Sequence, residues 1–238
     1  MPSIITPSMT NHKSTEPQID QIIRSNRRSI SLEIHPNGSL VVRAPKSASN
    51  TQIQSLVARK ADWIAKSREK AARRYGDLKP KTFTPGETFW YLGEQYPLQL
   101  TNRQRPPLDL DGAFLLSRAA QDRAKAVFIA WYREETRQIT QNFVDSYARR
   151  NGFRVKGVRI TSARTRWGSC SANRTLNFTY RLSMAPLEVI EYVVVHELAH
   201  LKEHNHSQNF WRVVAKLMPD YQTRRRWLKQ NGYLLNLD

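Results

Sequence analysis

Alternating apolar and polar residues near the start of the chain predict a β-hairpin. Two runs in which every second residue is apolar flank the dipeptide Asn37-Gly38. Such alternation is the pattern of a strand with one buried face, and Asn-Gly accepts the positive φ angles of a tight hairpin turn. The expected inward-facing residues are Ile30, Leu32 and Ile34 on the first strand and Leu40, Val42 and Ala44 on the second.

Between residues 50 and 75 the apolar period changes to that of an amphipathic helix. One stripe at helical spacing carries the apolar side chains, while most lysines and arginines of the segment lie off it. A basic helix face either contacts phosphates or is simply solvated, and the sequence leaves both interpretations open. The stripe consists of Ile53, Leu56, Val57, Trp63 and Ile64.

The middle of the chain predicts further strands and one long helix. Short strands are expected at 89–92, 96–100 and 114–116, joined by loops that contain proline or glycine. A helix is expected from 118 to 150, and Gly152 is placed to cap its C-terminus. Its predicted buried stripe is Val127, Phe128, Trp131, Ile139, Phe143 and Tyr147.

The last third of the chain continues to alternate between strands and helices. Strands are predicted around 158–160 and 176–180, followed by a helix from Pro186 to about Lys202. Two more helices follow, because capping residues and helix terminators recur at suitable spacing. They are expected to begin at Ser207 or Asn209 and at Asp220, and to end before Pro219 and Gly232.

Together these elements predict an α+β protein with three parts. Residues 1–20 are polar, contain three prolines and lack periodic apolar positions, so a disordered, mobile tail is expected there. Residues 21–117 are expected to form a β-rich N-terminal region with one helix. Residues 118–238 are expected to form a C-terminal domain in which a helix packs on a small sheet.

Composition narrows the partners and the compartment. The 238 residues include 38 lysines and arginines against 20 aspartates and glutamates, a net charge of +18. This excess favours an anionic partner: nucleic acid, nucleotides, an acidic polypeptide or a membrane surface. A single cysteine, Cys170, excludes an intrachain disulfide and favours a reducing compartment. No run approaches the ~20 apolar residues of a membrane span and no secretory signal is evident, so a cytoplasmic location is expected.

The strongest chemical signal is the pentapeptide His196-Glu197-Leu198-Ala199-His200, which follows three consecutive valines. On a helix, residues four apart lie on one face about one turn apart, so both imidazoles can bind one zinc ion. The glutamate between them is then placed to accept a proton from a metal-bound water. One alternative is an ordinary pair of helical histidines, which would leave buried polar groups in need of partners. The other is a purely structural zinc site, which usually uses cysteines.

A catalytic zinc usually has three protein ligands and one open position, so a third histidine is needed. In a continuous helix His204 would lie ~12 Å from His196 along the axis, too far for two bonds of ~2.0–2.1 Å to one ion. His206 requires the chain to leave the helix and turn back, and Asn205 is a residue type that tolerates a left-handed turn. The spacing therefore favours His206.

Four motifs in the C-terminal half occur in a characteristic order. They are Arg166-Trp167-Gly168-Ser169-Cys170, Leu176-Asn177-Phe178, the segment from Val193 to His200, and Asn205-His206-Ser207 followed by Phe210-Trp211. This order closely resembles the YgjP-like metal-dependent hydrolases, a family related to the SprT-like and WLM zinc metallopeptidases. The resemblance runs from about residue 22 to 232 and is densest over 164–228. It implies a zincin-like domain with His196, His200 and His206 as ligands of one zinc ion and Glu197 as catalytic acid and base.

The chemistry expected from these residues is metal-assisted hydrolysis. Zinc lowers the pKa of its bound water toward ~7, Glu197 accepts the proton, and the hydroxide attacks a carbonyl or phosphoryl centre. Glu197 then returns the proton to the leaving group. The developing oxyanion needs a donor besides zinc. Arg166 is the candidate, with Arg164 and the backbone of 168–170 beside it; the alternative is that Trp167 and Cys170 pack the core while the arginines face water.

Three functions are compatible with this site. The preferred one is a peptidase acting on intracellular protein. The second is a phosphohydrolase of nucleoside triphosphates or related anhydrides, whose charge the many arginines and lysines would neutralise. The third is a nucleic-acid-associated metalloprotein, with the basic helix at 51–75 and Arg224 to Arg226 as its electrostatic footprint. Charge alone supports the third, since no nucleic-acid-binding motif is present.

Overall fold

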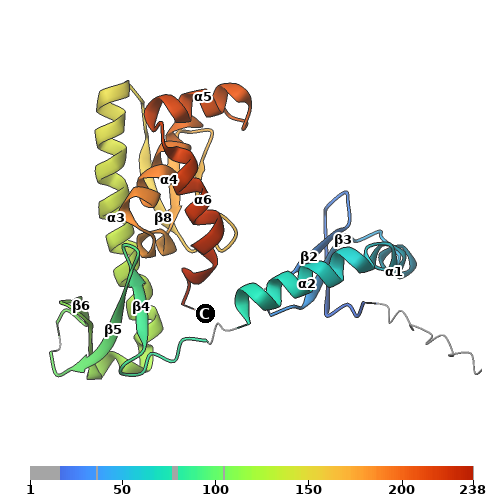
Figure 1. The fold of residues 1–238 in the computed structure, drawn as a ribbon, viewed down its shortest axis with the longest axis horizontal. Coiled ribbons are helices and arrows are strands. Elements are labelled where there is room, and N and C mark those ends of the chain that lie inside the picture. The colour runs from blue at the N-terminus through green and yellow to red at the C-terminus, as the bar shows by residue number, and fades with distance from the viewer. Residues whose placement is uncertain (1–16, 36, 77–79, 104, 238) are drawn as a thin grey trace, which may run out of the picture. The chain divides into compact units, whose positions relative to one another are not determined.

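The computed structural model describes residues 17–35, 37–76, 80–103 and 105–237 (Figure 1). The chain forms two compact units, one up to residue 78 and one from residue 79 onward. Residues 1–16 of the tail predicted over 1–20 lie outside the described residues. Beyond them, the backbone N–H of Asp20 donates to the carbonyl of Leu40 at 3.0 Å. The boundary predicted at 117/118 coincides with the end of a strand inside the second unit.

The first unit is a three-stranded sheet covered by two helices. The strands β1 (Gln21–Ser25), β2 (Ser31–Ile34) and β3 (Leu40–Pro45) lie in the order β1-β3-β2, with β1 parallel and β2 antiparallel to β3. The predicted hairpin is confirmed: Ile34 pairs with Leu40, and Gly38 has a φ of 80°. The core of the unit consists of Leu40, Val42, Ala44, Ile53, Val57 and Ile64.

The segment 50–75 was predicted as one helix, but it forms two helices. The prediction of a continuous helix is therefore wrong. α1 (Asn50–Arg59) and α2 (Ala61–Tyr75) are separated at Lys60, whose φ of −105° and ψ of 13° are not helical. Ile53 and Val57 of α1 and Ile64 of α2 still share one core, but Trp63, which belonged to the predicted stripe, is 45% exposed. Neither glycine nor proline marks this break, so the local sequence contains no signal for it.

The second unit begins with a four-stranded sheet of order β4-β5-β7-β6. The strands predicted near 89–92, 96–100 and 114–116 are present. The segment from 105 to 112, predicted as a loop, also contains a short strand, because Leu108 and Leu110 pair with the strand that follows. The bounds are β4 (Thr88–Tyr91), β5 (Glu94–Thr101), β6 (Leu108–Leu110) and β7 (Phe114–Ser117).

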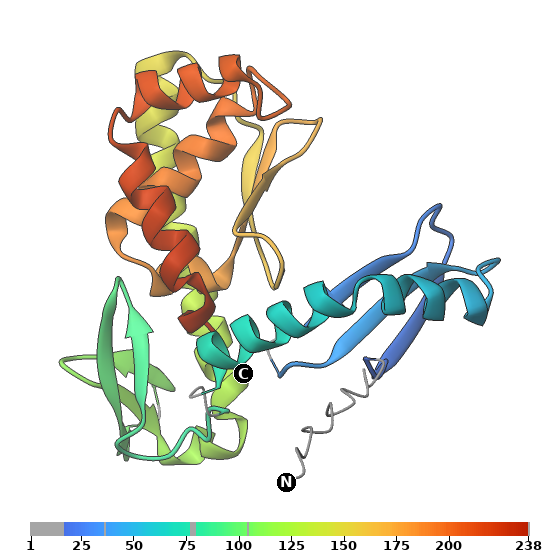
Figure 2. The same ribbon diagram turned by 45° about the vertical axis from the view of Figure 1, so that its right-hand side comes forward.

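A second sheet, four α-helices and three short 3₁₀ segments complete the described part of this unit (Figure 2). β8 (Gly157–Thr161), β9 (Gly168–Cys170) and β10 (Thr175–Thr179) lie in the order β8-β10-β9, so that β9 is an edge strand. Helix α4 contacts β9 as well as α3, α5 and α6. The helices are α3 (Ala124–Asn151), preceded by the 3₁₀ turn η1 (Arg118–Arg123), then η2 (Tyr180–Met184), α4 (Leu187–Ala199), α5 (Gln208–Leu217), α6 (Tyr221–Asn231) and η3 (Gly232–Leu234).

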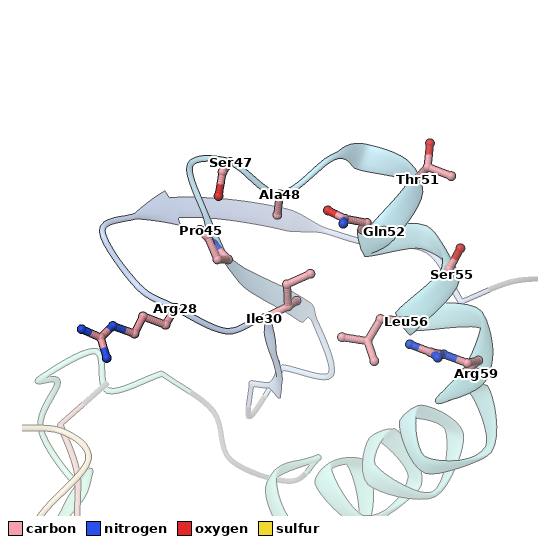
Figure 3. Close-up of a pocket in the computed structure, with 10 residues that line it drawn as sticks. All are labelled: Arg28, Ile30, Pro45, Ser47, Ala48, Thr51, Gln52, Ser55, Leu56 and Arg59. Atoms are coloured by element: carbon pink, nitrogen blue, oxygen red, sulfur yellow. The ribbon is translucent and has the colours of Figure 1, made fainter.

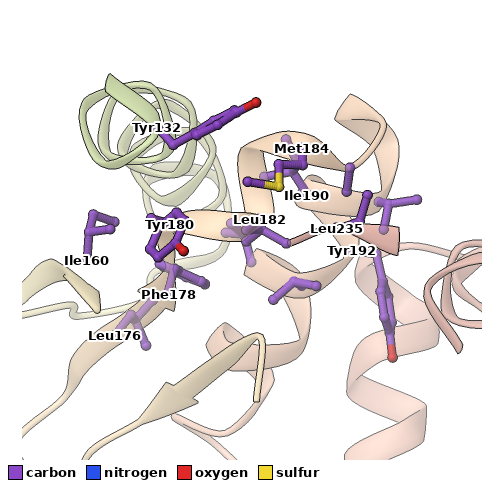
Figure 4. Close-up of a cluster of buried hydrophobic side chains, with 14 of the residues drawn as sticks. Tyr132, Ile160, Leu176, Phe178, Tyr180, Leu182, Met184, Ile190, Tyr192 and Leu235 are labelled. Atoms are coloured by element: carbon purple, nitrogen blue, oxygen red, sulfur yellow. The ribbon is translucent and has the colours of Figure 1, made fainter. Parts of the chain in front are cut away.

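The α+β class and the helix packed on a small sheet are therefore confirmed. Large side chains from α3, β10, η2 and α4 meet in one core (Figure 4). Gly152 ends α3 with a φ of 67°, as predicted. None of the helices in the described ranges is both long and apolar enough to cross a membrane.

The buried stripe of α3 shares only Phe128 and Tyr147 with the predicted one, because the other predicted residues are partly buried at its edge and two buried positions are polar. Thr136 and Thr140 are fully buried. The hydroxyl of Thr136 donates to the carbonyl of Tyr180 at 2.8 Å and lies 2.9 Å from Ser183 Oγ. Hydrogen bonds of this kind offset the cost of burying a hydroxyl, and a hydrophobicity pattern cannot detect them. The buried positions are Ala124, Phe128, Tyr132, Thr136, Thr140, Val144 and Tyr147.

Candidate metal centre

The helix that carries the H-E-x-x-H motif is buried along most of its length. Pro186 stands at its N-cap, and the three valines before His196 are all buried. The helix ends at Ala199, three residues earlier than predicted, and His200 occupies the C-cap. Because the helix stops there, the following eight residues are free to turn back over it.

Three histidines converge at this helix end. One ligand atom from each of His196, His200 and His206 lies within 4.8 Å of the others, within the described parts of the chain. The Nε2 atoms of His196 and His206 are 3.0 Å apart. Two nitrogen ligands of one tetrahedral zinc lie roughly 3.3 Å apart, given bonds of ~2.0–2.1 Å, so this donor set fits a zinc ion. His204 is exposed and is not part of the cluster.

Contacts around the imidazoles hold them in place. Nδ1 of His200 lies 3.0 Å from the carbonyl of Glu203, which leaves its Nε2 facing the other rings. The Oγ of Ser207 accepts a hydrogen bond from the N–H of Phe210 and so caps α5 directly after His206. The buried Phe210 ring lies 4.5–4.9 Å from all three imidazoles. Such supporting contacts fix ligand orientation.

The turn that returns His206 to the helix is not made as predicted. Asn205 was expected to adopt a left-handed conformation. Among the described residues other than glycine, only Phe83, Leu92 and Arg174 have a positive φ. The turn instead follows from the early end of α4 and from the hydrogen bonds of Leu201 and Lys202 to carbonyls of the last helical turn.

The electrostatics of the cluster favour neutral imidazoles. Burial, together with the charges of His200, His206 and Arg225, lowers the pKa of His196 to about 3. Its Nδ1 is buried and has no hydrogen-bond partner in the described structure. A neutral imidazole is the form that binds a metal ion. The arrangement therefore suits a cation better than it suits protonated histidines.

Glu197 lies beside the cluster and is only 4% exposed. Burial raises the pKa of its carboxyl to about 8, against the opposing effect of Arg166. Its Oε2 has no hydrogen-bond partner among the described residues. Gly168 of β9 approaches the carboxylate so closely that a Cβ at this position would lie 2.6 Å from Oε1 of Glu197.

Other residues of the Arg166 motif lie near this carboxylate or act on it through their charge. A hollow of about 200 Å³ is lined in part by Arg166, Gly168 and Asn177. Arg166 is exposed, and its charge acts on Glu197. Burial and the charge of Glu197 raise the pKa of the Cys170 thiol, which disfavours a nucleophilic thiolate. An oxyanion-stabilising role for Arg166 stays a prediction.

A larger open groove of about 620 Å³ lies in the first unit (Figure 3). Its walls come from the segment before β2, from the end of β3 and the residues after it, and from helix α1, and they include no histidine, cysteine or acidic residue. The candidate metal ligands lie instead at the end of α4. The groove is lined by Arg28, Ile30, Pro45, Ser47, Ala48, Thr51, Gln52, Ser55, Leu56 and Arg59.

Sequence reasoning did not connect α6 with the histidines. The guanidinium of Arg225 lies over the ring of Trp211, 4.4 Å from its centroid, and its charge reaches His196. The run of arginines at 224–226 was visible in the sequence, but only as a general basic patch. Its position beside the site follows from the packing of α6 on α4.

Comparisons with known proteins found a matching family and related proteins. The profile of a family described as YgjP-like, metallopeptidase domain, matches residues 28–231. The chain is 31% identical over 78 residues to the UTP pyrophosphatase of Escherichia coli (strain K12), which is 31% of this chain and 47% of the relative. The chain thus spans about half the length of that curated relative. Among solved structures, the metallopeptidase zymogen of Pyrococcus abyssi abylysin is similar, with 25% identity, 38% of this chain and 92% of that chain covered, and a TM-score of 0.35.

Proposed function

This chain belongs to the YgjP-like metallopeptidase-domain family, and we propose that it hydrolyses its substrate at a zinc ion held by His196, His200 and His206. The observation that carries the proposal is the convergence of three imidazoles, with ligand atoms within 4.8 Å of one another, beside a buried carboxylate. When bound, a divalent cation supplies Lewis acidity, which lowers the pKa of an attacking water and polarises the bond to be broken.

Glu197 is the proton carrier in this proposal. Its buried Oε2 accepts a proton from the attacking water and then returns that proton to the leaving group. Burial raises its pKa to about 8, so both the acid and the base form are accessible near neutral pH. The positive charge of Arg166 opposes this rise in the pKa, because it favours the ionised carboxylate.

Peptide-bond hydrolysis is the first candidate reaction, because the family domain is a metallopeptidase domain. A second candidate is hydrolysis of a phosphoanhydride bond in a nucleoside triphosphate. Two observations favour the second: the matched relative is a UTP pyrophosphatase, and Arg166 and Arg225 bring positive charge to Glu197 and His196. Both reactions use the same attacking water and the same proton carrier.

The test compares the zinc-loaded protein with its Glu197→Gln variant on unfolded protein and on UTP. Loss of the proton carrier is expected to reduce kcat by about 10²- to 10⁴-fold while the bound zinc remains. Mass spectrometry of the peptides, and chromatography of UMP and pyrophosphate, identify the reaction. Glu188→Gln is the matched control, because Glu188 is an exposed residue of the same helix. Hydrolysis that persists in Glu197→Gln would contradict the proposal.

A further inference from the structure

Arg225 is an exposed residue of α6, and α6 packs along the helix that carries His196 (Figure 2). Its guanidinium carbon lies 4.4 Å from the centroid of the Trp211 ring. The same indole stacks on Tyr221, with centroids 5.4 Å apart and planes at 17°. An arginine placed over an aromatic face in this way has fewer accessible orientations than a free surface arginine.

Trp211 joins this arginine to the metal centre. Its ring stacks on the imidazole of His206, with centroids 5.9 Å apart and planes at 25°. It also lies 5.9 Å from the ring of His196. The Trp211 indole is therefore next to the guanidinium of Arg225 and to the imidazoles of His196 and His206. The influence of the guanidinium charge on His196 is the electrostatic counterpart of this proximity.

Arg225 also lacks the acidic partner that its neighbour has. Arg224 forms an ion pair with Asp220 and lies within the electrostatic range of Glu188 and Glu191. In the described part of the chain no carboxylate forms an ion pair with Arg225. A guanidinium that lies over an aromatic ring next to two of the histidines, and that has no carboxylate partner in the described residues, is available for an anionic ligand.

We propose that Arg225, oriented by Trp211, is a substrate-binding residue that holds an anionic oxygen group of the substrate beside the three histidines. This inference rests on the proposed hydrolytic function of the same site. A planar guanidinium donates two parallel N–H bonds to phosphate or carboxylate oxygens. The anion is either a phosphate of a nucleotide or the carboxylate of an acidic residue near the scissile peptide bond. Its role is to position the substrate, so it acts on KM more than on kcat.

The experiment measures KM and kcat of zinc-loaded protein for three probes. They are UTP, a glutamate-rich peptide mixture, and the same mixture with glutamine in place of glutamate. Arg225→Gln is expected to raise KM for the anionic probe that is hydrolysed by about 10-fold, the value of one charge-assisted hydrogen bond, with kcat within about twofold. Arg225→Lys keeps the charge but not the planar guanidinium. Its KM is expected to lie between those of the unchanged protein and Arg225→Gln.

Arg226→Gln is the matched control. Arg226 is an exposed neighbour on the same helix, and its replacement removes the same charge. Equal KM changes in Arg225→Gln and Arg226→Gln would overturn the inference, because a general charge effect would then explain both. So would an equal KM change for the glutamine-containing peptides. A merely structural stack on Trp211 would lower the melting temperature without discriminating between the acidic and the neutral peptides.

A binding measurement separates failure of this inference from failure of the proposed function. In a Glu197→Gln background, titration calorimetry reports the Kd of each anionic probe without turnover. A weaker Kd in Arg225→Gln supports the inference even where Glu197 proves unnecessary for hydrolysis. Zinc-dependent and Glu197-dependent hydrolysis with an unchanged Kd and KM in Arg225→Gln overturns the inference and leaves the proposed function intact. Failure of both anionic probes to bind the zinc-loaded protein also overturns it.

Discussion

Gly168 and Glu197 illustrate how single residues set this site. Glu197 comes from α4, whereas Gly168 comes from the edge strand β9, 29 positions earlier in the chain. The carboxylate occupies the space that a side chain at Gly168 would need. A close approach between the strand backbone and the carboxylate is therefore possible only with glycine here. The lack of a side chain at Gly168 thus helps to determine where the proton carrier stands.

Gly168→Ala is expected to lower hydrolysis by about 100-fold, because displacement of a reacting group by ~1 Å costs that much. The new Cβ would lie 2.6 Å from Oε1 and 2.7 Å from the γ-carbon of Glu197. Zinc content should be unchanged. Gly157→Ala is the control, because no atom lies within 4 Å of its Cβ position. Kinetics and metal analysis of both variants check the prediction, and equal activities would contradict it.

At the scale of elements, helix ends position the ligands. α4 ends at Ala199 and α5 begins at Gln208, so His206 reaches His196 from a loop that both helices anchor. The capping hydroxyl of Ser207 fixes the start of α5 directly after that ligand. A continuous helix would have carried the chain away from the cluster, since each residue advances ~1.5 Å along the axis.

His206→Ala is expected to weaken zinc binding by more than about 100-fold, because changes to residues behind the ligands already cost 10- to 100-fold. His204→Ala should leave zinc affinity within about twofold, since that imidazole is exposed and lies outside the cluster. Competition with a chelating dye gives both affinities. Stronger zinc loss in the His204 variant than in the His206 variant would exclude the proposed ligand set.

At the scale of the whole molecule, two separate cores support the two units. One core consists of residues between Leu40 and Ile64, and the other begins at Phe83. All three histidines and Glu197 belong to the second unit. The stability of the metal centre therefore depends on the second core. The net charge of +18 is a property of the full chain, and a nucleic-acid partner stays a prediction from it.

A fragment of residues 79–238 is expected to fold and to bind one zinc ion with the affinity of the full chain. The reason is that no buried residue of its core comes from the first unit. Circular dichroism during heating shows whether a cooperative transition remains, and metal analysis reports the stoichiometry. A fragment that lacks such a transition would show that the second unit needs the first. The full-length protein, melted under the same conditions, serves as the reference.

The sequence by itself determined the elements that depend on local chemistry. The hairpin around Gly38, the cap at Gly152 and the H-E-x-x-H helix follow from backbone preferences and from apolar spacing within a few residues. The preference for His206 over His204 rested on a continuous helix, whereas α4 ends at Ala199, so the outcome matched the prediction although its premise did not hold. The α+β class followed from the alternation of these elements.

Only the tertiary structure decided which distant residues meet. The break at Lys60 and the buried threonines of α3 depend on packing, which a local pattern does not contain. The contact between Gly168 and Glu197, and the position of Arg225 over Trp211, join elements that are far apart in the chain or lie on different helices. These contacts form because β9 and α6 pack on α4. That packing is a property of the folded core rather than of any one segment.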